Sequence, residues 1–126
     1  MKTTLMLSAL LVIATVSASG SDALKLAVSP KQAFAPSNLN IRARVVPDPT
    51  NRVLEVVAES GEFYRSSKTQ LEGDQAPAMI TFEFRGVPGG DYTISGTLID
   101  DKGRRRAVAT EHVMILSMMD QPAVSQ

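Results

Sequence analysis

The sequence predicts an all-β domain, a seven-stranded antiparallel sandwich preceded by a signal peptide. Three observations support this prediction. Apolar and polar residues alternate with a period of two in several short runs, no helical period follows the N-terminal apolar segment, and Gly, Pro, Asp and Asn punctuate the chain at intervals of roughly 8 to 15 residues. This pattern favours two packed antiparallel sheets over alternating strands and helices.

The N-terminal segment has the layout of a secretory signal peptide. Lys2 precedes the uncharged apolar run 5–16, "LMLSALLVIATV", and small residues follow at once. The run is short for a membrane-spanning helix, and Val16 and Ala18 occupy the positions that a signal peptidase reads. We therefore predict a signal peptide over 1–18 and export to the periplasm or the medium, with an uncleaved anchor as the alternative.

The predicted mature chain consists of one domain, 19–116, and a loose tail, 117–126, without periodicity. It contains no cysteine, so thiol catalysis, cysteine metal sites and disulfides are excluded. Loss of Lys2 with the signal peptide leaves 12 basic and 13 acidic residues, a net charge of −1. This balance indicates neither nucleic acid nor an anionic membrane as a partner, and no stable membrane span remains after cleavage.

The first three predicted strands lie at 24–28, 39–46 and 52–59. The clearest is 39–46, "LNIRARVV", in which Leu, Ile, Ala and Val share one face while Asn and both arginines share the other. A helix would distribute the arginines around its circumference. The following "PDPTN", 47–51, is expected to be a stiff loop, because each proline fixes φ and removes a hydrogen-bond donor.

The second half of the domain continues the alternation after a Ser-Gly turn at 60–61 and a loop at 72–77. In "MITFEF", one isoleucine and two phenylalanines are expected to face inward. The "DDKG" sequence, 100–103, is expected to form a hairpin turn with Gly103 at a positive φ. The remaining four strands are predicted at 62–71, 79–84, 92–98 and 104–115.

Tyr92 is predicted to lock a crossover between the sheets. It follows the glycine turn formed by Gly89 and Gly90 and precedes the core residue Ile94 by two positions. This placement is typical of the tyrosine corner of Greek-key sandwiches, in which the phenol donates a hydrogen bond to a backbone group slightly upstream. We therefore assign structural roles to Tyr92, Gly89 and Gly90.

The stretch "GVPGGDYTISGTLIDDKG", 86–103, resembles the corresponding region of bacterial extracytoplasmic immunoglobulin-like and fibronectin type III-like domains. The resemblance extends over 24–116 and is most specific at 78–104. It implies an immunoglobulin-like fold and a role in binding or scaffolding, without catalytic residues. The inter-sheet cysteines and core tryptophan of antibody domains are absent, which places the chain in a cysteine-free branch.

Little in the sequence indicates catalysis or a cofactor, and we expect neither. His112 is the only histidine, and no nucleophile motif accompanies it. A copper carrier is one alternative, because an imidazole and thioethers suit Cu(I), and Met114, Met118 and Met119 lie near His112 in the sequence. Core or edge methionines beside a loose tail would produce the same pattern.

The loops that follow the second and sixth strands are the first choice for a ligand surface, because sandwich domains bind through loops on a rigid scaffold. These loops should emerge at the same end of the molecule. The ligand residues proposed there are Asp48, Asn51, Asp100, Asp101 and Arg104. The three aspartates raise calcium as an alternative, but their spacing matches no EF-hand loop and Asp is also a preferred turn residue, so no metal site is assigned.

The seventh strand begins with three arginines, 104–106, whose alternation places the middle one on the opposite face from the other two. They are expected to discourage edge-to-edge pairing rather than to form one anion site. Facing Glu111 or His112 inward is unfavourable, so a bulge midway along the strand is expected. Val57 and Ile99 should face outward on neighbouring strands and could receive a partner.

The sequence thus favours an exported, non-enzymatic module that binds a protein or a glycan at the cell envelope or outside the cell. A periplasmic copper carrier and a structural or assembly subunit that works by strand pairing are the alternatives. The oligomeric state is left open.

Overall fold

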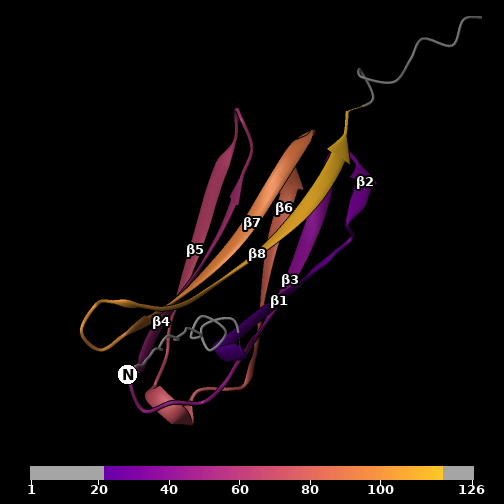
Figure 1. Cartoon of the computed structure of the whole chain (residues 1–126). Coiled ribbons are helices and arrows are strands. Elements are labelled where there is room, and N and C mark those ends of the chain that lie inside the picture. Colours follow the sequence, from indigo (N-terminus) through magenta and orange to yellow (C-terminus); the bar gives the residue numbers. More distant parts are fainter. Residues whose placement is uncertain (1–21, 118–126) are drawn as a thin grey trace, which may run out of the picture.

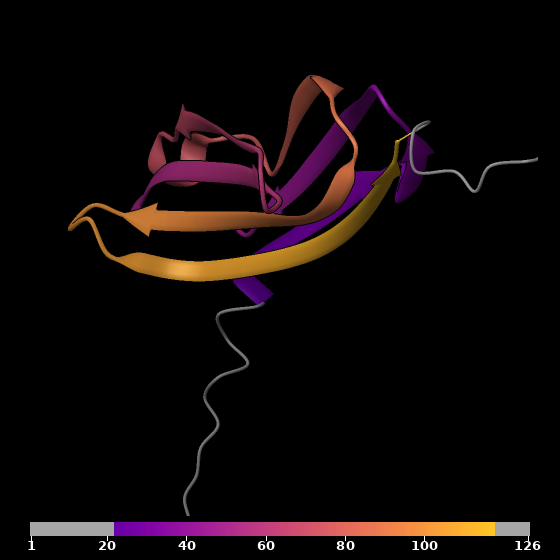
Figure 2. The same cartoon turned by 90° about the horizontal axis from the view of Figure 1, so that it is seen from above.

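The computed structural model describes residues 22–117, which form two packed β-sheets (Figures 1 and 2). The three-stranded sheet has the order β1-β3-β6 and the five-stranded sheet has the order β2-β8-β7-β4-β5. An all-β two-sheet sandwich is therefore confirmed. The strands are β1 (Leu24–Ser29), β2 (Gln32–Phe34), β3 (Ser37–Val45), β4 (Asn51–Glu59), β5 (Tyr64–Gln70), β6 (Met79–Val87), β7 (Gly90–Asp100) and β8 (Arg105–Leu116).

The described residues contain eight strands, so the prediction of seven is wrong by one. The missed strand, β2, pairs in parallel with the end of β8, with Gln32 opposite Met114. Three residues between two prolines give no periodic signal, which is why the alternation did not reveal it. The other seven strands overlap the predicted ranges, and the loop at 72–77 contains a short 3₁₀ helix, η1 (Gly73–Gln75).

Alternating residues of both sheets meet in a single core. On β3, every second residue from Ser37 to Val45 is buried, and the polar residues between them are exposed. Inward residues of β4 and β7 are likewise fully buried, as the period-two pattern requires. The core therefore fixes the register of the central strands, because a slip by one residue would expose each apolar face.

The bulge predicted in the seventh strand is present, but not midway. Ala107, Val113 and Ile115 of β8 all face the core in one continuous alternation, which places Glu111 on the inward face as well. Glu111 is only partly buried, and Lys31 Nζ lies 2.8 Å from its Oε1. The register with β7 shifts instead between Leu98 and Ile99, next to Arg106.

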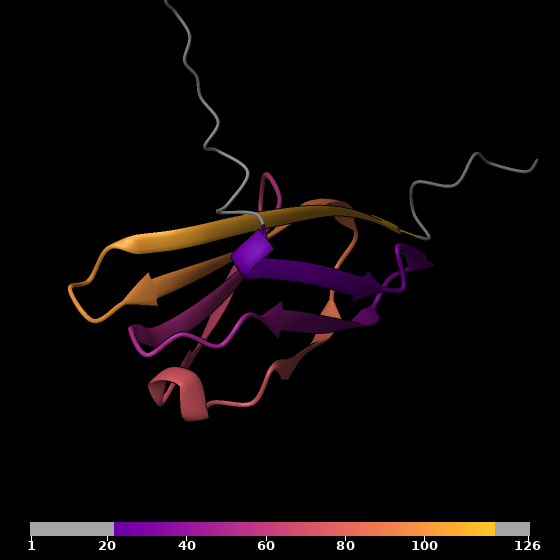
Figure 3. The same ribbon diagram turned by 60° about the horizontal axis from the view of Figure 1, so that its bottom comes forward.

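Several connections gather at one end of the sandwich (Figure 3). The β3–β4 loop, η1 and the β7–β8 turn lie there together, while the β6–β7 crossover lies at the other end (Figures 1 and 3). The predicted signal peptide and most of the predicted tail lie outside the described residues. Within residues 22–117, no helix has the length and apolar character needed to cross a membrane.

Candidate functional site

The β3–β4 loop and the β7–β8 turn are neighbours, as the sequence predicted. Asn51, at the start of β4, lies opposite Asp100, at the end of β7, in the sheet register. The η1 segment packs closely against the same loop. A Cβ atom added to Gly73 would lie only 2.8 Å from the Pro49 carbonyl oxygen. We call this surface, formed by 46–50, 73–75 and 100–104, the loop end.

Asp48 organises the β3–β4 loop. Its Oδ1 accepts hydrogen bonds from the Thr50 hydroxyl, at 2.6 Å, and from the Thr50 backbone N–H, at 2.8 Å. An Asp side chain that binds the backbone two residues later forms an Asx turn. These two bonds, and to a smaller extent the Arg106 guanidinium, lower the pKa of the Asp48 carboxyl. Asp48 is therefore ionised and committed to its own loop at neutral pH.

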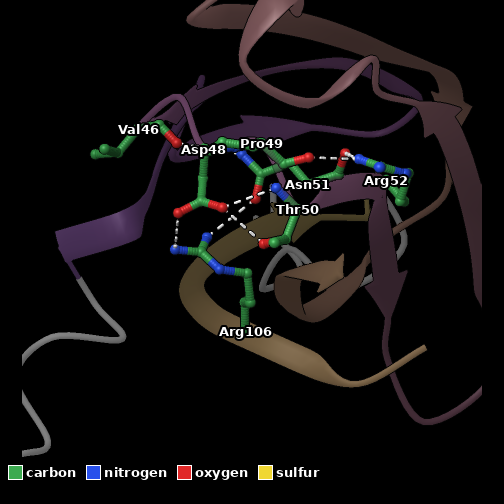
Figure 4. A network of polar contacts seen from close by, with 7 residues as sticks. All are labelled: Val46, Asp48, Pro49, Thr50, Asn51, Arg52 and Arg106. Atoms are coloured by element: carbon green, nitrogen blue, oxygen red, sulfur yellow. Dashed lines mark hydrogen bonds and ion pairs between the residues drawn. The ribbon is translucent and has the colours of Figure 1, made fainter. Parts of the chain in front are cut away.

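Arg106 links this loop to β8 (Figure 4). Its Nη2 lies 3.3 Å from Asp48 Oδ2, and its Nη1 donates a 3.0 Å hydrogen bond to Asn51 Oδ1. The bulge beside Arg106 inserts one extra residue into β8. Arg106 contacts the β3–β4 loop while Arg105 beside it remains exposed.

Asn51 supports the loop end from within. Its side chain is fully buried, its Nδ2 donates to the Val46 carbonyl oxygen at 3.2 Å, and its Oδ1 is occupied by Arg106. Arg52 completes the network, with Nη1 donating to the carbonyl oxygens of Pro49 and Asn51 at 2.7 and 2.9 Å (Figure 4). Asn51, proposed as a ligand residue, is therefore buried, and its side chain supports the loop end.

The β7–β8 turn is organised by Asp100 in the same way that Asp48 organises the β3–β4 loop. The Asp100 Oδ1 accepts hydrogen bonds from the backbone N–H groups of Lys102 and Arg104, both at 2.9 Å. Gly103 closes the turn at φ +78°, as predicted. The bond from the Arg104 backbone is the largest of the influences that lower the pKa of Asp100. Asp101 and Arg104 are exposed, and Arg104 Nε lies 3.6 Å from Asp100 Oδ2.

The geometry does not favour the calcium alternative. Asp48 faces Thr50 and Arg106, and Asp100 binds the backbone of its own turn. Across residues 22–117, no group of three or more His, Cys, Asp or Glu side chains is arranged to hold a metal ion. The loop end therefore presents charged groups on a braced scaffold and not a set of converging carboxylates.

At the opposite end, Tyr92 makes the hydrogen bond expected of a tyrosine corner. Its hydroxyl donates to the Pro88 carbonyl oxygen at 2.9 Å, and its side chain is fully buried. Phe63 packs edge-on against its ring, with the centroids 5.7 Å apart. Gly89 and Gly90 have no positive φ. A Cβ on Gly90 would lie 3.0 Å from Tyr92 Cε1, and one on Gly89 would lie 3.0 Å from Ser117 Cβ, so close packing explains both glycines.

The other residues singled out in the sequence lie on the outer face of the five-stranded sheet. His112 and Met114 are both exposed on β8, two residues apart, whereas Met118 and Met119 lie outside the described residues. Val57 and Ile99 are half-buried on this face, as expected. Val57 and Ile99 are separated on this face, because Val57 lies opposite Ser95 and the pair Glu55–Thr97 lies between it and the pair Val53–Ile99.

Sequence reasoning missed Arg106 as a member of the network. Its charge was visible, but its contacts depend on the bulge, whose position is set by pairing with β7. The Asp48–Thr50 interaction had a local signal, because Asp followed two residues later by Thr suits an Asx turn.

Comparison with known proteins identifies a shared fold and no family. No protein-family model and no curated protein matches the chain. A structure of superoxide reductase (neelaredoxin) from Ignicoccus hospitalis matches with a TM-score of 0.52 and 14% identity, covering 74% of this chain and 79% of that one. A second structure of that protein gives a TM-score of 0.51 and 15% identity over 77% and 85% of the two chains. A CARDB domain from Pyrococcus furiosus, in complex with di-metal ions, gives 0.48 and 16% over 75% and 91%. At these identities the likeness shows the two-sheet β-sandwich fold alone.

Proposed function

We propose that this chain is an exported, non-enzymatic module of the bacterial immunoglobulin-like or fibronectin type III-like kind. It binds a protein or a glycan at the cell envelope or outside the cell, and the loop end is its ligand surface. Asp101 and Arg104 contact the ligand, while Asp48, Asp100 and Asn51 hold the loops in place.

The observation that carries this proposal is the pair of contacts that Arg106 makes with Asp48 and Asn51, which we call the Arg106 brace. Arg106 ties the β3–β4 loop to β8 through Asp48 and Asn51, and Asp100 holds the adjoining turn. Loops held this firmly lose little conformational entropy on binding, which favours recognition. Asp101 and Arg104 extend from this braced surface and are accessible.

Site-specific crosslinking tests the ligand surface. A photoreactive residue at Asp101 should capture a protein, or retain a labelled glycan, from an envelope preparation of the native organism. The matched control carries the same group at Ser66, which is exposed on β5 away from the loop end. Equal capture from both positions, or capture from Ser66 alone, would contradict the proposed surface. Arg104→Ser should reduce capture from Asp101 without changing the melting temperature.

A periplasmic copper carrier is the second candidate, favoured by one observation. His112 and Met114 are both exposed and occupy the same face of β8, where an imidazole and a thioether can meet a soft ion. Titration of the purified protein with Cu(I), compared with His112→Ala, separates the two functions. A stoichiometric site that disappears in the variant would support the carrier, and identical titrations would remove it.

A further inference from the structure

Three cationic side chains gather on the outer face of the three-stranded sheet. Lys25 lies directly opposite Arg44 in the β1–β3 register. Arg42 precedes Arg44 by two residues on β3 and lies on the same exposed face. Within residues 22–117, none of the three makes an ion pair or a hydrogen bond through its side chain. Like charges placed opposite one another in a sheet repel, so a bound anion would relieve a repulsion that the fold itself creates.

Two shallow hollows adjoin one another across this face. The first is lined by Lys25, Leu26, Ala27, Arg42, Arg44 and Met79. The second is lined by Ala27, Val28, Ser29, Asn40, Arg42 and Thr81. Ala27 and Arg42 belong to both, so the hollows form one continuous depression, which we call the basic groove. Ala27 lies opposite Arg42 in the register, and its small side chain keeps the centre of the groove low.

The charge in the basic groove is of one sign. No acidic residue lines either hollow. The nearest acidic residue in the register is Glu83, opposite Asn40, and its Oε1 is already bound by Arg85 Nε at 3.1 Å. The overall charge is balanced, so the cations on this face are offset by acidic residues elsewhere on the molecule.

We infer that the basic groove binds an acidic polysaccharide. The Arg42 and Arg44 guanidinium groups match carboxylates in bidentate geometry, and Lys25 adds a third cation beside them. At the other end of the groove, Ser29, Asn40 and Thr81 offer hydroxyl and amide groups that complement sugar hydroxyls. A polysaccharide that carries both carboxylates and hydroxyls can therefore bind the cationic end and the polar end of the groove at the same time.

Two other polyanions suit the groove less well. Single-stranded nucleic acid is bound by stacking on aromatic side chains, and no aromatic residue lines either hollow. An anionic membrane presents a broad surface, whereas the cations here flank a recess with Ala27 at its centre. The recess fits a single extended chain.

Binding to polygalacturonate, with neutral dextran as the uncharged comparison, tests this inference. Arg42→Gln/Arg44→Gln should weaken binding by about tenfold or more, because two charge-assisted hydrogen bonds are lost. The matched control is Lys68→Gln/Arg105→Gln, which removes the same charge from exposed positions of the five-stranded sheet and should bind like the wild type. Equal weakening by the control, or no binding of polygalacturonate by the wild type, would overturn the inference.

Lys25→Glu provides a second, independent variant. It places an acidic residue opposite Arg44, so the melting temperature should rise while polygalacturonate binding falls. Retained binding in this variant would overturn the inference, as would wild-type binding to phosphatidylglycerol vesicles in preference to the polysaccharide. The loop-end variant Asp101→Ser/Arg104→Ser should bind polygalacturonate normally, so the inference can fail or succeed separately from the proposed function. Loss of binding in that variant would also count against the basic groove.

Discussion

Arg106 Nη1 donates a 3.0 Å hydrogen bond to Oδ1 of the fully buried Asn51, and this bond joins the start of β4 to the start of β8. The Asn51 side-chain nitrogen Nδ2 donates a hydrogen bond to the Val46 carbonyl oxygen, at the other end of the β3–β4 loop. One buried amide therefore connects the two ends of the β3–β4 loop with β8, which is distant in sequence. Arg106 also faces Asp48, so the same guanidinium holds both the loop and its buried support.

Arg106→Ala should destabilise the protein by about 1 to 3 kcal/mol, because it leaves the buried Asn51 Oδ1 without a donor. Chemical denaturation measures this change. Arg105→Ala, at the exposed neighbouring position, should stay within about 0.5 kcal/mol of the wild type. A double-mutant cycle with Asn51→Ala should show coupling between the two residues. Additive effects would contradict the brace.

The fold was largely predictable because alternation is a local signal. The apolar face of β3 and the Tyr92 hydrogen bond at the crossover follow from residues adjacent in sequence. β2 was not predictable, since three residues carry no measurable period. The site was predictable only in part. The turns at Asp48 and Asp100 have local signatures, but the inward orientation of Asn51 and the reach of Arg106 depend on the sheet register.

Tyr92→Phe should lower the free energy of unfolding by about 0.5 to 1.5 kcal/mol, because the hydrogen bond from the Tyr92 hydroxyl to the Pro88 carbonyl oxygen is lost while the ring packing against Phe63 is kept. Tyr64→Phe is the matched control, since Tyr64 is 62% exposed and should tolerate the change. Equal effects in the two variants would show that the corner contributes nothing specific. Urea denaturation followed by circular dichroism makes the comparison.

Tyr92 should also make the fold sensitive to alkali. Burial of the phenol raises its pKa above the ordinary value of 10.0. Above that value the unfolded chain loses the proton while the folded chain keeps it, so stability is fully present below about pH 10 and falls as the pH rises. Absorbance titration of Tyr64→Phe, which leaves Tyr92 as the only tyrosine, should show the folded protein ionising above the ordinary value of 10.0. Ionisation of Tyr92 in the folded protein at or below that value would contradict this expectation.

Asp48 and Asp100 at the loop end should make the stability of the fold sensitive to acid, whereas Tyr92 makes it sensitive to alkali. Hydrogen bonds from Thr50 lower the pKa of Asp48 below 3.8, and those from the Arg104 and Lys102 backbone lower the pKa of Asp100. The unfolded chain takes up protons first as the pH falls, so the contribution of both carboxylates is present above about pH 4 and is lost below it. Asp48→Asn keeps an acceptor for Thr50 without a titrating charge, and it should make melting temperature less dependent on pH between about 2 and 4. An unchanged pH dependence would argue against the Asp48 contribution.

Two glycines with positive φ allow the packing of η1 to be separated from backbone strain. Gly73 has φ +60° and a Cβ there would lie 2.8 Å from the Pro49 carbonyl oxygen, whereas Gly103 has φ +78° and nothing within 4 Å of the same added atom. Gly103→Ala should cost about 1 kcal/mol, from the left-handed conformation alone. Gly73→Ala should cost more, because η1 or the β3–β4 loop must also move to admit the methyl group. Thermal denaturation of both variants measures the difference, and crosslinking from Asp101 in Gly73→Ala reports whether the loop end has shifted. Equal destabilisation would mean that η1 does not pack firmly on the β3–β4 loop, which would leave Arg106 and Asn51 as the principal supports of the loop end.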